Sequence, residues 1–326
     1  MSALLLGVLT LMFFWPLFSG HTFSTVAGHQ SSVYPWRGFP TGFADCTQCD
    51  QADLSYPWQC FITQSLHDGE FPFWNPYSFG GQPLFANGSN AILYPPRLLF
   101  SLLLPPSWSH DLLSILHVFG AGLAMYFLLR DFGSGSGGAV FGAVTWMFSG
   151  FNLAWLQLEV VAPVFLFLPL NLLGVRNALC RESLAACFAA SAILASCLVA
   201  GHLPFMGITC LPAIAYAACL AGTRAVRSAR AADWRACARS VGLAAGVAIL
   251  PGLLAAVVLL PTMLAVGASQ RGTFRYEDQH EFIRSAAAVF FQIVSRPAVP
   301  PTAEAMPRPT SASRPSHLCC SARCSV

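Results

Sequence analysis

Aromatic and amide side chains that could bind a sugar gather between Asp68 and Phe100, a stretch that includes "DGEFPFWNPYSFGGQP". Aromatic faces and amide groups suit a polyol. The stretch also contains Asn75-Pro76 and Gly80-Gly81, which are pairs typical of turns. The candidate residues can therefore instead form the core and turns of a small folded cap, and for each of them singly we favour that interpretation. They are Trp74, Asn75, Tyr77 and Tyr94.

Cysteines could supply metal or redox chemistry, because the chain contains 12 of them. "CTQC", from Cys46 to Cys49, together with Cys60 offers three ligands in one loop, whereas a structural zinc site needs four. A structural disulfide among these three is the stronger prediction. The cysteines in or beside apolar segments are most simply small hydrophobic side chains. These are Cys180, Cys187, Cys197, Cys210, Cys219 and Cys237.

The composition places these residues in a membrane protein. Of 326 residues, 55% are hydrophobic and only 10% are charged, and the mean hydropathy is +0.59. Soluble domains carry roughly 25% charged residues. The net charge of +3 is too small to suggest nucleic acid as a partner.

Seven apolar runs predict an all-α polytopic fold, because a membrane-crossing helix needs about 20 such residues. The first run lacks the basic start and small-residue cleavage site of a signal peptide, so we expect an uncleaved first span. The seven runs are Ala3–Phe18, Leu112–Leu129, Gly137–Trp155, Val161–Val175, Leu184–Ala200, Leu203–Leu220 and Val241–Val266.

The arginines predict how the spans are oriented, because cytoplasmic loops are enriched in positive charge. With the N-terminus inside, three short cytoplasmic loops contain eight arginines, five of them in "TRAVRSARAADWRACARS". The much longer loop from Ser19 to Asp111 contains only Arg37 and Arg97. We therefore expect a multi-pass protein of the bacterial inner membrane, with a cytoplasmic N-terminus and an outward-facing first loop.

The long first loop is expected to fold as a cap on the outer face. "DLSYPWQCFITQSLHDG" predicts an amphipathic surface helix that Gly69 can end, with an apolar face formed by Leu54, Trp58, Phe61, Ile62 and Leu66. "AILYPPRLLFSLLLPP" is too short to span and suggests an interfacial or re-entrant segment. Backbone at that depth must be buried or line a wet cavity. A cavity beneath the cap would suit a substrate with one end in lipid.

The cap sequence resembles the first outer loop of YfhO-type bacterial membrane proteins, which belong to the GT-C class of glycosyltransferases. The matching core is a Gly-x-x-Pro-x-Trp-Asn-Pro-Tyr run at Gly69–Tyr77, followed by Gly80–Pro83, Ala86-Asn87 and Tyr94–Pro96. Downstream segments such as "FGAVTWMFSGF" and "LLPTMLAVGASQRG" fit the same pattern. The resemblance covers roughly residues 44–282.

The resemblance implies transfer of a sugar from a polyprenyl-phosphate donor to a cell-envelope acceptor on the outer face. That chemistry needs a carboxylate at the membrane surface, which takes the acceptor proton or holds a divalent metal such as Mg or Mn. The matching residue is Asp53, and Asp50 lies three residues earlier with Asp45 before it. All three can also be ordinary solvated loop carboxylates.

The resemblance also suggests residues that bind the donor. Arg271, after the seventh span, is the better-matched partner for its phosphate. Arg97 could meet the phosphate or extend to the membrane interface. His202 matches a family histidine, but "GHLPF" lacks the glutamine that often follows it. With Asn87 and the four sugar-binding candidates, these residues complete the predicted substrate site.

Two other function classes stay open. A transporter would place ionisable residues or broken helices at mid-membrane. His117 is almost the sole ionisable residue inside a predicted span, and we interpret it as a packed histidine. Pro169, Pro212 and Pro251 could kink their spans. The other class is an inactive, truncated membrane module of the same family.

The end of the chain supports the truncated-module alternative. "RPAVPPTAEAMPRPTSASRPSHLCCSARCSV" has no apolar span and is expected to be a disordered, aberrant tail from a frameshift or truncation. The predicted organisation is a first span at 1–19, a cap loop at 20–111, six spans at 112–266, an extracytoplasmic segment at 267–295 and the tail at 296–326.

Overall fold

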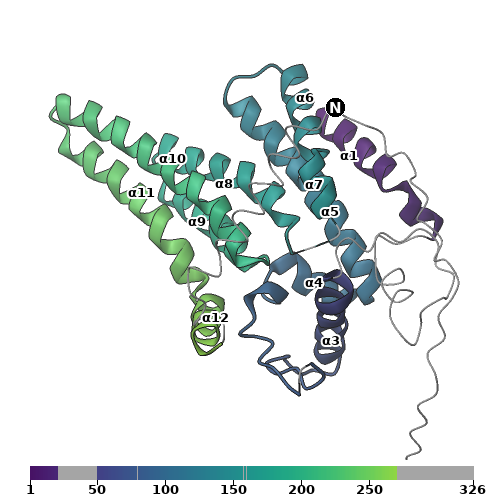
Figure 1. The fold of residues 1–326 in the computed structure, drawn as a ribbon. Coiled ribbons are helices and arrows are strands. Elements are labelled where there is room, and N and C mark those ends of the chain that lie inside the picture. Colours follow the sequence, from purple (N-terminus) through teal and green to yellow (C-terminus); the bar gives the residue numbers. More distant parts are fainter. Residues whose placement is uncertain (21–49, 79, 157, 159, 270–326) are drawn as a thin grey trace, which may run out of the picture. The chain divides into compact units, whose positions relative to one another are not determined.

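Helices form the architecture of a computed structural model that describes residues 1–20, 50–78, 80–156, 158 and 160–269 (Figure 1). The described residues contain no strand. The helices in chain order are α1 (Ser2–Phe13), η1 (Trp15–Ser19), η2 (Gln51–Ser55), α3 (Tyr56–His67), η3 (Gly88–Asn90), α4 (Pro95–Leu103), α5 (Pro106–Asp131), α6 (Ser136–Met147), α7 (Gly150–Trp155), α8 (Pro163–Cys180), α9 (Leu184–Val199), α10 (Leu203–Arg230), α11 (Trp234–Leu254) and α12 (Ala256–Ala268).

Four helices are long and apolar enough to cross a membrane: α5, α8, α10 and α11, with 26, 18, 28 and 21 residues. The apolar helices α1, α9 and α12 are shorter. Large apolar side chains point away from the bundle, including Ile208 and Leu211 on α10 and Ile249 and Leu253 on α11. Such contiguous apolar surface is typical of helices surrounded by lipid. The protein is therefore an all-helical membrane protein.

Small residues let the helices of the bundle pack closely. Ala190 on α9 and Ala213, Ala217 and Ala221 on α10 are buried in one apolar core. A Cβ on Gly174 of α8 would lie 3.4 Å from the Ala190 Cα, so these two backbones approach each other. Close backbone approach through small residues is how helices associate in membranes, where the solvent is as apolar as the side chains.

Two of the predicted spans are divided in the structure. The run Gly137–Trp155 forms α6 and α7, separated at Phe148 and Ser149, and the Asn152 side chain donates to the Met147 carbonyl at 2.6 Å across this break. The run Val241–Val266 forms α11 and α12, which meet at Ala255 shortly after Pro251. Proline removes a backbone donor and weakens the helix around it, and hydropathy alone does not reveal such breaks.

The arginine-rich segment predicted as a short cytoplasmic loop is almost entirely helical. Helix α10 continues to Arg230 and α11 begins at Trp234, so only residues 231–233 connect them. Alanine and arginine have high helix propensity, which extends both helices past the apolar run. The Asp233 side chain caps α11 by accepting from the Ala236 N–H at 3.0 Å.

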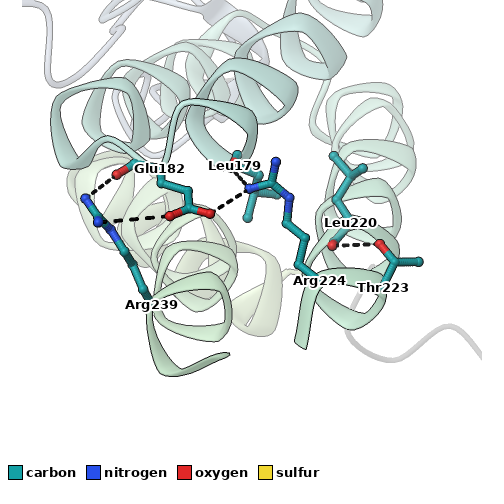
Figure 2. A network of polar contacts seen from close by, with 6 residues as sticks. All are labelled: Leu179, Glu182, Leu220, Thr223, Arg224 and Arg239. Atoms are coloured by element: carbon teal, nitrogen blue, oxygen red, sulfur yellow. Dashed lines mark hydrogen bonds and ion pairs between the residues drawn. The ribbon is translucent and has the colours of Figure 1, made fainter. Parts of the chain in front are cut away.

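Charged contacts join the three arginine-rich turns at one end of the bundle. Glu182, between α8 and α9, accepts from Arg224 of α10 at 3.2 Å and its backbone carbonyl accepts from Arg239 of α11 at 2.6 Å (Figure 2). Arg224 also donates to the Leu179 carbonyl, and Arg176 pairs with Asp131 at the end of α5. Helix α9 runs from this end to the turn at 200–202, which therefore lies at the opposite end.

The predicted cap helix is confirmed as η2 and α3, which Gly69 follows at φ +78°. Trp58 and Ile62 are buried, and the rest of the predicted apolar face packs partly buried around them. The short apolar segment forms α4. Between these elements, Asn75 and Gln82 pair their backbones at 2.8 and 2.9 Å, which confirms the predicted turn. Gly80 and Gly81 within it have φ of +75° and +114°.

A buried polar layer fastens the cap to α5. The Gln59 amide of α3 donates to Ser101 at 2.8 Å and to Ser109 at 3.1 Å, and the Gln51 amide lies 2.7 Å from His110. Arg97 of α4 is 2% exposed in the same region. Buried polar networks of this kind specify a single arrangement of the elements they join. The cap is therefore a fixed part of the fold.

Candidate functional site

A cavity of about 900 Å³ lies between the cap and the turns at the end of the bundle that is remote from the arginines. Its cap wall comes from Asp50, from the end of η2, from α3 and from the segment 82–89. Its bundle wall comes from residues between α7 and α8, from the start of α10 and from the end of α12. Pockets for small ligands occupy roughly 300–1,000 Å³ and combine apolar walls with a few placed polar groups. This cavity meets both conditions.

The cap wall supplies a carboxylate and two polar atoms available to a ligand. Asp50 lines the cavity from the position before η2. Ser55 and Gln82 line it too, and the Ser55 Oγ and the Gln82 Nε2 are buried without a hydrogen bond to any described residue. Leaving a buried polar atom unsatisfied costs about 1–3 kcal/mol, so a ligand hydroxyl that pairs with it gains binding free energy.

The bundle wall presents His202 just before α10. The His202 N–H donates to the Val160 carbonyl at 3.1 Å, and its ring lies 5.1 Å from the ring of Phe205. The preceding Gly201 has φ +151°, and a Cβ there would lie 2.4 Å from the Val160 oxygen. Only glycine fits this approach, which fixes the His202 imidazole at the cavity wall.

Asn87 lines the cavity and also shapes its rim. Its side-chain oxygen accepts from the Ser89 N–H at 3.2 Å and caps the short helix η3. A Cβ on Gly88 would lie 3.1 Å from both Leu203 and Thr262, so this turn packs directly on α10 and α12. The segment Ala86–Ser89 thus joins the cap to the bundle at the cavity.

The other predicted site residues lie away from the cavity. Asp53 is exposed on the far side of η2 and does not line it. Asn75 is 3% exposed, and its side chain bonds within its own turn, to the Tyr77 N–H at 2.9 Å and to Ser78 at 3.2 Å. Arg97 is buried in the polar layer beside α5. Arg271, Asp45, Cys46 and Cys49 are outside the described residues.

Trp74 and Tyr77 differ from the expectation that they form the cap core. They are 56% and 84% exposed. The reason is the direction of the turn. The Asn75 side chain points into the cap, and the rings of Trp74 and Tyr77 on either side of it in the sequence remain at the surface. They also do not line the cavity, so the structure does not bring the four aromatic and amide candidates together.

Tyr94 and His117 form a packed pair, as expected for His117. The Tyr94 hydroxyl lies 3.0 Å from the His117 Nε2 and the two rings stack at 5.7 Å. Both side chains are buried. Burial, with a smaller contribution from Cys197, raises the pKa of Tyr94 above its ordinary value, so the hydroxyl stays protonated. This pair holds the cap against α5.

Sequence reasoning missed Ser55, Gln82, Thr262 and Ser269, which all line the cavity. They come from separate segments and form no motif, so no sequence signal marks them. Within the described ranges, no group of three or more His, Cys, Asp or Glu side chains is arranged to hold a metal ion.

Comparisons with known proteins add no relative. The chain matches no protein-family model, no curated protein and no solved structure.

Proposed function

We propose that the protein is a glycosyltransferase of the bacterial inner membrane that binds a polyprenyl-phosphate-linked sugar in the cavity beneath its cap. The sugar passes to a hydroxyl of a cell-envelope acceptor on the outer face. The observation that carries the proposal is the cavity itself, whose mostly apolar wall includes a carboxylate, an imidazole and the polar residues Ser55 and Gln82. A sugar phosphate with a lipid tail needs this combination.

The proposed topology has seven passes, a cytoplasmic N-terminus and an outward-facing cap. Its support is the meeting of three arginine-rich turns at one end of the bundle, where Glu182 joins Arg224 and Arg239. Positive charge is retained on the cytoplasmic side. The cavity lies at the other end, which supports an outward-facing site for the proposed chemistry.

The proposed mechanism assigns proton removal to Asp50. The acceptor hydroxyl attacks the anomeric carbon, the bond from that carbon to the phosphate oxygen breaks, and the hydroxyl proton passes to the Asp50 carboxylate. His202 faces the same cavity and would bind the phosphate that leaves with the polyprenyl chain. Asp50 is preferred to Asp53 because Asp50 lines the cavity and Asp53 does not.

Binding to the purified full chain tests the proposal before any acceptor is known. Undecaprenyl-phosphate glucose should bind more tightly than undecaprenyl phosphate, because the sugar hydroxyls reach Ser55 and Gln82. Ser55→Ala should reduce that difference, whereas Ser65→Ala, a buried serine of α3 away from the cavity, should leave it unchanged. Equal affinity for the two lipids in the parent protein would contradict a sugar site here.

A further inference from the structure

Two cysteines and a methionine meet in the apolar core where α9 packs on α10. Cys197 and Met206 are 0% exposed and Cys210 is 6% exposed. Met206 and Cys210 are four residues apart on α10, so they lie on the same face of that helix. Cys197 faces them from the last turn of α9. Three sulfur atoms, which are soft metal ligands, therefore lie near one another where the two helices meet.

The sulfur positions suit a three-coordinate metal ion. The Cys197 Sγ lies 3.9 Å from the Met206 Sδ, and the Cys210 side chain neighbours Cys197. With metal–sulfur bonds of about 2.3 Å, sulfur atoms at the corners of a trigonal plane lie about 4 Å apart. The separation between Cys197 and Met206 matches that spacing, so this pair needs little rearrangement to bind one ion.

A polar group beside the sulfurs provides a second, independent indication. Asn171 of α8 is 1% exposed and contacts Cys197, yet its amide makes no regular hydrogen bond to any described residue. An amide N–H is a good donor to a thiolate, and such partners orient metal ligands and tune them. A negatively charged Cys197 thiolate would explain why a polar amide lies in this apolar core.

We infer that Cys197, Cys210 and Met206 form a binding site for a soft monovalent metal ion, with Cu(I) as the physiological candidate. Thiolate and thioether ligands select Cu(I) over harder ions. Binding releases both thiol protons, because cysteine coordinates metals as the thiolate, so two thiolates and one thioether around Cu(I) carry one negative charge. The Asn171 amide N–H beside Cys197 would donate to that charge. The site lies directly behind Leu203, Pro204 and Phe205, which line the cavity, and it would stiffen that wall.

The inference does not depend on the proposed function, and Cu(I) titration of the purified full chain tests it. The background should carry serine at the cysteines outside the buried core, at positions 46, 49, 60, 180, 219, 237, 319, 320 and 324, so that accessible thiols do not compete. The expected result is one bound Cu(I), with a copper–sulfur distance of about 2.2–2.3 Å by X-ray absorption. Cys197→Ser and Cys210→Ser should each abolish this equivalent, and Met206→Leu should weaken its binding.

Matched controls separate metal binding from folding. Cys187→Ser removes another buried thiol of α9, which points instead toward the Leu243 carbonyl at 3.6 Å, and should bind Cu(I) like the parent. Asn171→Leu keeps all three sulfurs and should weaken binding by about 10- to 100-fold. Equal binding by Cys187→Ser and Cys197→Ser, or a Cys197–Cys210 disulfide in protein purified without reductant, would overturn the site.

Discussion

Gly81 lies against the indole of Trp74 so closely that a Cβ on Gly81 would be 2.6 Å from the Trp74 Cζ2. Gly81 also has φ +114°, a backbone conformation that side chains disfavour. The cap turn therefore requires glycine at this position for two separate reasons. Gly80, its neighbour, has φ +75° and open space where a Cβ would stand, so it requires glycine for one reason only.

Gly81→Ala should consequently destabilise the protein more than Gly80→Ala. The strained backbone alone costs about 1–2 kcal/mol at either position. At Gly81 the indole must also move, which adds to the loss. Thermal unfolding of the two variants in detergent measures the difference. Equal shifts of the unfolding temperature would show that the Trp74 contact contributes nothing.

Asp50→Asn should abolish sugar transfer while leaving the fold intact. The change preserves size and removes the charge, and loss of a general base costs about 100- to 10,000-fold in rate. Asp53→Asn is the matched control, because it makes the same change on the side of η2 away from the cavity. Transfer from the polyprenyl-phosphate donor is the measurement. If only Asp53→Asn abolished sugar transfer, Asp53 would be the general base. If both variants lost a similar small fraction of activity, neither carboxylate would be the general base.

Single cysteines at two exposed positions should label from opposite sides of the membrane. Tyr77→Cys, on the cap, should react with a membrane-impermeant maleimide in intact cells whose outer barrier is permeabilised. Ala232→Cys, between α10 and α11, should react only after the inner membrane is opened. Both sites are exposed, so access to reagent is the only difference. The reverse pattern would place the cavity in the cytoplasm.

Tyr94 should make the protein sensitive to alkali. In the unfolded chain a tyrosine ionises near pH 10.0, whereas burial raises the pKa of Tyr94 in the folded protein. The folded state then holds its proton where the unfolded state has lost it. The stability contributed by this group is thus present below about pH 10 and falls as the pH rises further. Tyr94→Phe should lessen the fall of the unfolding temperature between pH 9 and pH 11, and Tyr77→Phe, at an exposed ring, should not.

Local chemistry made most of the fold predictable. The helical nature of the apolar runs, the amphipathic helix that ends before Gly69 and the Gly-Gly turn follow from periodicity and backbone preference and are present, whereas only four of the described helices are long enough to cross a membrane. The break at Ala255 follows Pro251, which the sequence marks as able to kink its span, whereas the break at Phe148, beside Ser149 and Gly150, was not predicted. The break at Phe148 depends on a single side-chain contact and the break at Ala255 on a proline.

The candidate site was predictable only where a residue stands in a motif. Asn87 and His202 line the cavity as members of the predicted site, and so does Asp50, which was predicted only by its closeness to Asp53. Ser55 and Gln82 reach the cavity because segments far apart in the sequence pack together. No single segment reveals that packing. Tyr94 and Arg97 have the chemistry of binding residues but are buried in the joint between cap and bundle.

The segment η2, Gln51–Ser55, is a π-helix, in which the Tyr56 N–H donates to the Gln51 carbonyl five residues back. This winding holds one residue more than an α-helical turn, so everything before it is rotated by about 100° relative to an α-helix. That extra residue decides which carboxylate enters the cavity. Deleting Ala52 would remove that residue and let the segment wind as a regular α-helix, and because the two changes cancel, Asp50 would keep its direction toward the cavity.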